Sequence, residues 1–256
     1  MDQAAVSAEP LEAGTAAAAP RPRVAYRHRL PTRLWHWLNA LTVFVMLMSG
    51  LMIFNAHPHL YWGQYGANFD HPWLSFRGRP IPGWATIPSS YSLAAARRWH
   101  LAFAWLLVVP LCLFLITSLM NRHAQRDLAP TAQEVKPRHI WHDIRDHARL
   151  RFPTGDAALR YNILQKLSYV AVIFVLLPLM LLTGLAMSPS MDAAWPWLLD
   201  LFFGRQSARS IHFICAMLLL AFIIVHLAMV VLAGPLNEIG SMITGRFRVP
   251  QERQDA

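Results

Sequence analysis

Four long apolar stretches, separated by polar segments, dominate the pattern of hydrophobic and polar positions along the 256-residue chain. They cover residues 34–54, 99–119, 167–187 and 211–233. About 20 helical residues cross the hydrocarbon core of a bilayer, so each stretch is long enough to span a membrane. The pattern predicts an all-α integral membrane protein built as a four-helix bundle.

The polar segments differ in composition, and each difference predicts a local structure. Residues 55–96 are rich in Pro, Gly and aromatic residues, which favours an ordered, irregular cap that can dock a partner. Residues 137–152 (PRHIWHDIRDHARLRF) repeat an apolar residue every four positions among basic ones, as in an amphipathic helix at a membrane interface. We expect a disordered N-terminal segment over residues 1–28, a membrane domain over 29–248 and a short tail over 249–256.

The charge distribution predicts the orientation of the bundle. The formal net charge is +9, and 17 of the 23 Lys and Arg residues lie in the N-terminal segment, the second loop and the C-terminal tail. The positive-inside rule then places both termini and the second loop in the cytoplasm and the long first loop outside. The basic charge follows from topology and does not indicate a nucleic-acid partner. We expect a multi-pass protein of the bacterial inner membrane.

Four histidines lie inside the predicted spans: His36, His100, His212 and His226. A lone histidine in an apolar helix is usually a hydrogen-bonded packing residue. Placing a histidine inside the membrane costs free energy, however, so four of them indicate a common functional role. In the predicted topology His36 and His226 lie toward the cytoplasmic side, whereas His100 and His212 lie near the external side. Depth therefore sorts the histidines into two pairs.

The spacing within the fourth span favours two haem groups. His212 and His226 are 14 residues apart, so they share a helix face to within roughly 40° and stand about 21 Å apart. A haem iron takes one imidazole from each of two helices, whereas zinc prefers three or four protein ligands. The chain has no C-x-x-C-H motif for covalent haem, and we expect its two cysteines, Cys112 and Cys215, to be small core residues.

Three arginines and a glycine fit the same interpretation. Arg33, Arg97 and Arg209 each precede a histidine by three residues, which places each guanidinium one turn outward, within reach of haem propionates. The alternative is that arginines anchor the helix ends. Gly50 follows His36 by 14 residues and lies at the depth of the external pair, where it leaves room for a porphyrin edge or for close helix packing.

Two of these regions resemble a known family. Residues 33–38 (RLWHWL) followed by Ser-Gly at 49–50 resemble the first-helix signature of the bacterial di-haem cytochrome b family, of the cytochrome b561 type. Residues 209–212 (RSIH), continuing through Phe222 to His226, resemble the signature of its fourth helix. Members of this family anchor nickel-iron hydrogenases, formate dehydrogenases and thiosulfate-reductase-type enzymes.

The resemblance covers residues 29–248 and is less specific for the partner enzyme. The chain differs from the hydrogenase version at Phe213, where Arg or His is expected, and at Met217, where Trp is expected. Residues 160–166 (RYNILQK) and 53–63 (IFNAHPHLYWG) look more like the thiosulfate-reductase and formate-dehydrogenase branches, whose partners are molybdopterin enzymes.

The resemblance also implies specific ligands. It assigns His36 and His226 to a cytoplasmic-side haem b, and His100 and His212 to an external haem b. A quinone is expected near the cytoplasmic-side haem, with Asn162 close to it. The alternative for Asn162 is the N-cap of the third span, a position that Asn favours.

The expected function is electron transfer between the quinone pool and an extracytoplasmic oxidoreductase, and the sequence leaves three alternatives open. The first is the cytochrome b subunit of a nickel-iron hydrogenase. The second is a transporter that uses membrane histidines as a proton or metal relay, which the absence of any Asp or Glu from the four apolar stretches disfavours. The third is a purely structural anchor.

Overall fold

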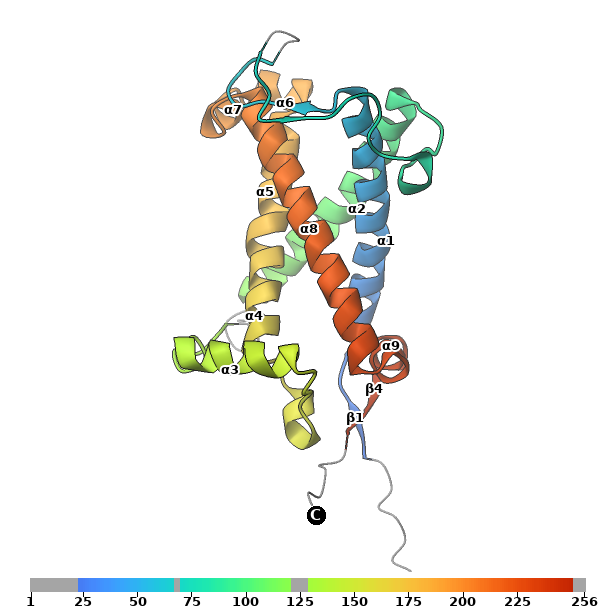
Figure 1. The fold of residues 1–256 in the computed structure, drawn as a ribbon, viewed down its shortest axis with the longest axis vertical. Helices are drawn as coiled ribbons and strands as arrows, with labels where there is room; N and C mark the ends of the chain where they lie inside the picture. Colours follow the sequence, from blue (N-terminus) through green and yellow to red (C-terminus); the bar gives the residue numbers. More distant parts are fainter. Residues whose placement is uncertain (1–22, 67–69, 121–128, 251–256) are drawn as a thin grey trace, which may run out of the picture.

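The computed structural model describes residues 23–66, 70–120 and 129–250. Three spans are single helices, α1 (Leu30–Ala56), α2 (Leu93–Met120) and α8 (Arg205–Ala233). The third span is composed of α4 (Ile163–Val170), a π-helical stretch η4 (Ala171–Leu176) and α5 (Leu177–Ala186). All four are long and apolar enough to cross a membrane, so the prediction of an all-α membrane bundle is confirmed (Figure 1).

Each span begins earlier than the apolar pattern predicts. The helices extend through polar first turns that include Arg33, Arg97 and Arg209, because hydropathy detects only the stretch suited to hydrocarbon. Pro110 lies inside α2, and Pro178 lies in the first turn of α5, directly after the π-helical stretch. At Pro178 the change of helical hydrogen bonding accommodates a residue that has no backbone N–H to donate.

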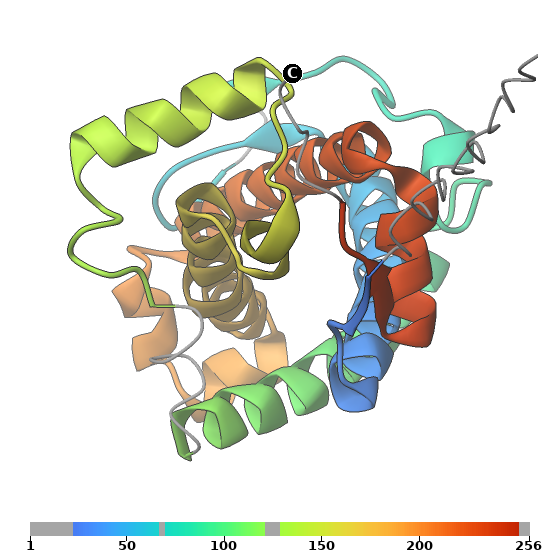
Figure 2. The ribbon, with the colours of Figure 1, turned by 90° about the horizontal axis from the view of Figure 1, so that it is seen from below.

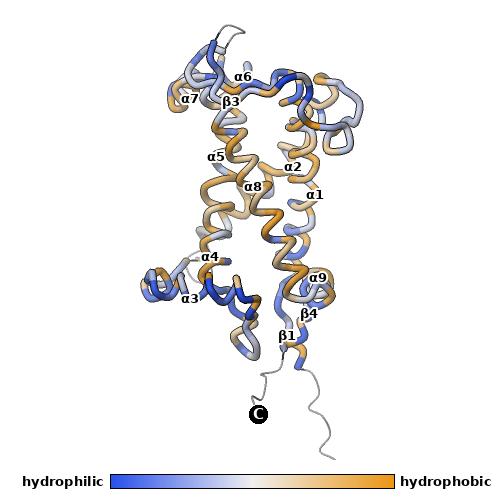
Figure 3. Tube along the Cα trace, viewed as in Figure 1, coloured by the Kyte–Doolittle hydropathy of each residue, from blue (hydrophilic) through white to orange (hydrophobic). Residues whose placement is uncertain are grey.

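The four spans cross one another in two packed pairs. In Figure 1, α8 runs diagonally, close to α5 at one end of the bundle and close to α1 at the other. Figure 3 shows that the spans are the most hydrophobic part of the chain. Between 11% and 28% of the most apolar window of each span is buried inside the protein, so most of this apolar surface faces outward, as lipid contact requires. The buried centre contains Leu107, Leu111, Leu177, Met180, Cys215 and Leu219.

Both ends of the described chain meet at the same end of the bundle, which we call the terminus end. There β1 (Val24–Tyr26) pairs antiparallel with β4 (Arg246–Arg248). The expectation that the disordered segment extends to residue 28 is therefore wrong for β1, and residues 1–22 lie outside the described part. Arg27 secures this contact, since its guanidinium bridges Glu238 at 3.2 Å and lies 4.5 Å from the ring centroid of Phe247.

Two further helices lie at the terminus end. The amphipathic prediction for residues 137–152 is confirmed by α3 (Pro137–Ala148), which Figure 2 shows outside the four spans. The second is α9 (Pro235–Thr244), which was not predicted and follows α8 after a sharp turn at Gly234 (φ 111°). A short helical turn, η3 (Gly155–Leu159), leads into the third span.

The opposite end, which we call the cap end, carries the long first loop. This loop contains β2 (His59–Leu60) paired with β3 (Leu74–Ser75), and the turn η1 (Gly83–Ala85). Two short helices, α6 (Pro189–Ala194) and α7 (Trp197–Leu201), complete the cap. Ser210 of α8 holds the loop down, because its hydroxyl donates to the carbonyl of Tyr61 at 2.6 Å and accepts from the indole of Trp73 at 2.9 Å.

The two cysteines differ in environment. Cys215 is buried in the central cluster, as expected, but Cys112 is exposed on the outer surface of α2. The expectation of a core position for Cys112 is therefore wrong. An apolar thiol on a spanning helix is compatible with lipid contact as well as with a core, so hydropathy does not separate the two environments.

Candidate functional site

His100 of α2 and His212 of α8 face each other near the cap end, and we call them the cap-end pair. Their ring centroids are 6.2 Å apart, with an angle of 62° between the ring planes. A hydroxyl group from another helix lies beside each ring. Ser49 Oγ is 3.1 Å from His100 Nδ1, and Thr183 Oγ1 is 3.0 Å from His212 Nδ1.

The hydrogen bonds of these hydroxyls determine where the imidazole protons lie. Ser49 Oγ donates its only proton to the Val45 carbonyl at 2.7 Å, and Thr183 Oγ1 donates its proton to the Leu179 carbonyl at 2.7 Å. Both oxygens must therefore accept a proton from the histidines. In each ring the proton is on Nδ1, so the lone pair of Nε2 is free to bind a metal.

The Met46 carbonyl supports this assignment for His100. It lies 3.1 Å from His100 Nδ1, and a carbonyl oxygen can only accept a hydrogen bond. The Nδ1 proton of His100 is thus shared between the Ser49 hydroxyl and a backbone oxygen. Outer hydrogen bonds of this kind orient a metal-binding histidine and raise its basicity.

Glycines lie beside both rings of the cap-end pair. A Cβ atom at Gly50 would be 3.4 Å from Cε1 of His100, and one at Gly184 would be 3.6 Å from Cε1 of His212. Any larger side chain at either position would extend into the space of the ring. Ser49-Gly50 on α1 and Thr183-Gly184 on α5 are therefore equivalent supports for the two histidines.

His36 of α1 and His226 of α8 form the terminus-end pair. Their ring centroids are 6.3 Å apart at an angle of 56°. Phe222 stacks on His226 at 5.8 Å, and Trp37 meets His36 edge-on at 5.3 Å. The Nδ1 atom of His36 is buried and makes no hydrogen bond to any described residue.

Both pairs fit an iron porphyrin. Two imidazoles that bind opposite faces of one iron place their ring centroids about 6 Å apart, close to the separations found in both pairs. Neither pair suits a metal ion that draws all its ligands from the protein, because no group of three or more His, Cys, Asp or Glu side chains in the described chain could hold a metal. A porphyrin supplies four of the iron ligands and needs only the two histidines.

Comparison with known proteins agrees with this geometry. A family model described as prokaryotic cytochrome b561 matches residues 27–245. The chain belongs to this family. Membership implies haem b binding and a role in electron transfer, and with the four apolar helices it identifies a protein of the bacterial inner membrane. The expected resemblance to bacterial membrane cytochromes b is thereby confirmed.

Relatives of this cytochrome b561 protein are subunits of more than one kind of complex. It is 29% identical over 200 residues to a putative protein-methionine-sulfoxide reductase subunit, YedZ1, of Azospira oryzae, covering 78% of this chain and 87% of the relative. It is 23% identical to a probable Ni/Fe-hydrogenase B-type cytochrome subunit of Azotobacter vinelandii (90% and 91% covered). A subunit with the same description in Cupriavidus necator is 22% identical (91% and 90% covered). No solved structure matches.

The predicted arginines have different surroundings. Arg33 donates to the Ile243 carbonyl of α9, and its buried Nε has no partner among the described residues. Arg209 donates to both the ring and the carbonyl of His57. Burial, followed by the charge of Arg209, lowers the pKa of His57, so His57 accepts as a neutral imidazole. Arg97 is exposed. Propionate binding by the three arginines stays a prediction.

Asn162 is the N-cap of the third span. Its side-chain oxygen accepts from the backbone N–H of Gln165 at 2.9 Å, and the Gln165 side chain returns a hydrogen bond to the backbone N–H of Asn162. Its amide nitrogen also lies 3.1 Å from Nε2 of His147, which joins α3 to the third span. The capping alternative is confirmed, and the quinone role of Asn162 stays a prediction.

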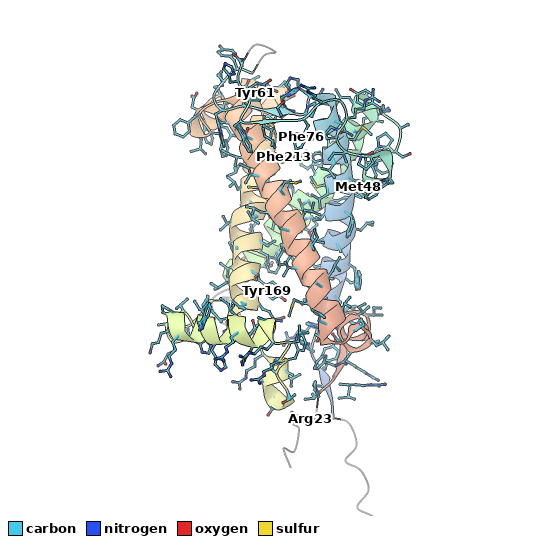
Figure 4. All side chains as sticks on the ribbon, in the orientation of Figure 1. Arg23, Met48, Tyr61, Phe76, Tyr169 and Phe213 are labelled. Atoms are coloured by element: carbon cyan, nitrogen blue, oxygen red, sulfur yellow. The ribbon has the colours of Figure 1, made fainter. Side chains whose placement is uncertain are left out.

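Thr183-Gly184 was missed by sequence reasoning. Its signal was available, because it repeats the Ser-Gly pair of the first span, but small residues are common in membrane helices for packing alone. Phe213, where the chain differs from the hydrogenase version, stacks on Phe54 of α1 at 4.7 Å, and Phe76 meets Phe54 edge-on at 6.0 Å. These contacts join α1, α8 and the first loop, and Figure 4 labels Phe76 and Phe213 near the cap end.

Proposed function

We propose that this cytochrome b561 protein carries electrons between the quinone pool and an extracytoplasmic oxidoreductase, through two non-covalent haems b. The observation that carries the proposal is the presence of two histidine pairs with ring centroids 6.2 Å and 6.3 Å apart. Each pair has the separation that one haem iron requires, and α8 contributes one histidine to each. His100 and His212 would hold one haem, and His36 and His226 the other.

Haem iron supplies one-electron redox chemistry when it is bound, and the chain supplies orientation and electrostatics. Ser49 and Thr183 hold the cap-end rings in one tautomer, while Gly50 and Gly184 leave space beside them. Arg33, Arg97 and Arg209 are proposed to bind propionates, for which a guanidinium is well suited. Arg209 would do so while remaining bonded to His57.

The charge bias supports an orientation with the terminus end in the cytoplasm and the cap end outside. The partner would then dock on the cap end, where Tyr65, Trp84 and Phe203 are exposed. Large exposed aromatic side chains are typical anchors of protein interfaces. The proposed partner is of the molybdopterin type, on the resemblance of residues 53–63 and 160–166 to those branches. Two of the relatives are probable Ni/Fe-hydrogenase cytochrome subunits, so a nickel-iron hydrogenase is the alternative partner.

A quinone site is proposed at the terminus end, close to the His36 and His226 pair. A membrane-confined carrier that exchanges protons needs a site that borders both lipid and a polar surface. Asn162, Gln165 and Lys166 enter the third span at this end, beside the polar helix α3. Asn162 retains one amide N–H beyond its bonds to Gln165 and His147, and this donor is available to a quinone oxygen.

The test of the partner is purification of the intact complex from membranes, followed by metal analysis. Molybdenum in the copurified subunit supports the proposed partner, whereas nickel identifies a hydrogenase.

The test of the quinone site is haem reduction by a quinol in Asn162→Ser, with Asn237→Ser as control. Asn237 of α9 also bonds backbone groups through its side-chain amide, but these groups belong to Arg248 of β4. Slower reduction in Asn162→Ser alone, at unchanged haem content, supports the site; equal rates in both variants contradict it.

The histidine-relay transporter is the candidate from another class. It requires a colourless purified protein whose membrane histidines exchange protons or metal ions with water. A strong haem absorbance that survives purification excludes it. The structural-anchor alternative requires a partner that works equally well when both histidine pairs are removed.

A further inference from the structure

Helix α3 lies across the direction of the spans at the terminus end and is held there at two points (Figures 1 and 2). Glu134, just before α3, accepts from Lys166 Nζ of the third span at 2.8 Å. His147, near the end of α3, bonds the Asn162 side chain at 3.1 Å. The helix is therefore fixed parallel to the expected membrane plane by contacts with the polar start of a spanning helix.

Helix α9 lies at a level similar to that of α3 in Figure 1. It turns three aliphatic side chains outward at a spacing of three and four residues: Leu236, Ile239 and Ile243. Exposed aliphatic side chains on one face of a helix that lies at the end of a bundle are typical of insertion into the headgroup region. By its level, α3 is therefore positioned to meet lipid headgroups.

The outward surface of α3 combines positive charge with an indole ring. Arg138, Trp141 and Arg145 follow one another at three and four residues, so they form one stripe along the helix. With Lys136 they line an open depression of about 450 Å³. Trp141, which lines the depression, is 68% exposed, and Ile144 on the same helix is 42% exposed, so both apolar side chains are accessible from outside.

The charges around the depression do not cancel. Asp146 and Asp143 lie 3.2 Å and 3.9 Å from the ring of His142, and Glu134 is bound to Lys166. None of the ion pairs found in the described chain involves Lys136, Arg138 or Arg145. The depression thus presents three cations that have no carboxylate partner among the described residues.

We propose that this depression binds the headgroup of an anionic phospholipid. The guanidinium groups of Arg138 and Arg145 would bind the phosphate, because a planar pair of N–H donors matches two phosphate oxygens. Trp141 would lie at the boundary between headgroups and acyl chains, where indole rings are enriched. A soluble anion would satisfy the arginines but would leave Trp141 and Ile144 in water, which favours a lipid as the occupant.

The experiment uses the full-length, haem-loaded protein in detergent. Short-chain phosphatidylglycerol is titrated into the wild type, the double variant Arg138→Gln/Arg145→Gln and the control Arg246→Gln/Arg248→Gln, and bound lipid is counted by native mass spectrometry. The control removes the same charge from β4 at the same end of the bundle. Each basic residue near an anionic lipid surface contributes enough that losing two is expected to weaken binding about thirtyfold.

The proposal expects wild type and control to bind alike, the Arg138/Arg145 variant to bind about thirtyfold more weakly, and phosphatidylcholine of equal chain length to bind far less than phosphatidylglycerol. Equal binding by the two double variants overturns it, and so does equal binding of the two lipids. Displacement of the lipid by an equal concentration of inorganic phosphate also overturns it, because the occupant would then be a soluble anion. Unchanged haem content in each variant establishes that the bundle is intact.

Discussion

Replacing Thr183 by Val removes the hydroxyl that accepts the Nδ1 proton of His212 and keeps a β-branched side chain of nearly equal volume. A histidine that donates from Nδ1 to an acceptor is more basic and therefore a better ligand for ferric than for ferrous iron. Losing the acceptor destabilises the oxidised form. Thr183→Val is thus expected to raise the reduction potential of the haem at the cap-end pair and to leave the other haem unchanged.

The size of the shift follows from the hydrogen bond that is lost. A hydrogen bond of this type contributes about 1 kcal/mol, and for a one-electron couple that free energy corresponds to about 40 mV. Ser49→Ala is expected to shift the same potential in the same direction, because each ring keeps one backbone acceptor, the Met46 carbonyl for His100 and the Met180 carbonyl for His212. The structure therefore predicts the direction of both effects.

The assay is a redox titration of the purified protein, followed at the haem absorbance bands. Thr117→Val is the matched control, since Thr117 also donates to a carbonyl four residues earlier, at 2.7 Å, but lies on the exposed surface of α2. A rise in one haem potential in Thr183→Val and no change in Thr117→Val agree with the assignment. A lowered potential, or equal shifts in both variants, would refute the proposed hydrogen-bond polarity.

Three further predictions concern other parts of the molecule. Replacing either His100 or His212 by alanine is expected to remove the same haem spectral component. The double variant is expected to lose little more haem than each single variant, because both histidines serve one iron. Loss of different components in the two single variants would contradict the pairing. Gly184→Leu is expected to lose the cap-end haem and to keep the terminus-end haem. The control Gly240→Leu is expected to keep both haems, because a Cβ at Gly240 meets nothing within 4 Å. Absorbance spectra of the purified variants measure how many haems each retains. The hydrogen bond from Lys166 lowers the pKa of Glu134 to about 2. The ionised carboxylate therefore stabilises the fold above pH 4.5, and this stabilisation is lost as the pH falls toward 2. The thermal unfolding temperature of Glu134→Gln should depend less on pH across this window than that of the wild type, and an equal dependence would contradict the prediction.

The spans and the two histidine pairs were predictable because hydropathy and helical periodicity act along one helix at a time. Long apolar stretches determine depth, and depth alone grouped His36 with His226 and His100 with His212. The ring separations then depend on how α8 crosses α1, α2 and α5. Sequence patterns within a single helix do not predict this crossing. The sequence therefore predicts which histidines meet, but not the hydroxyls that orient them.

The rest depends on contacts between segments far apart in the chain. β1 exists because β4, more than 200 residues later, supplies its hydrogen bonds, and three-residue strands carry almost no signal of their own. Helix α9 continues an apolar span after a turn at Gly234, so hydropathy cannot separate it from the membrane segment. Cys112 shows the same limit, because lipid-facing and core positions are equally apolar.

The central claim is that each histidine pair holds one haem b. A pyridine haemochrome assay on the purified protein, with protein quantified by amino-acid analysis, tests it most directly. The account predicts two non-covalent haems b per chain, falling to one when either pair is replaced by alanine. A ratio near one in the unaltered protein would leave one histidine pair without a haem, and a ratio near zero would contradict the account as a whole.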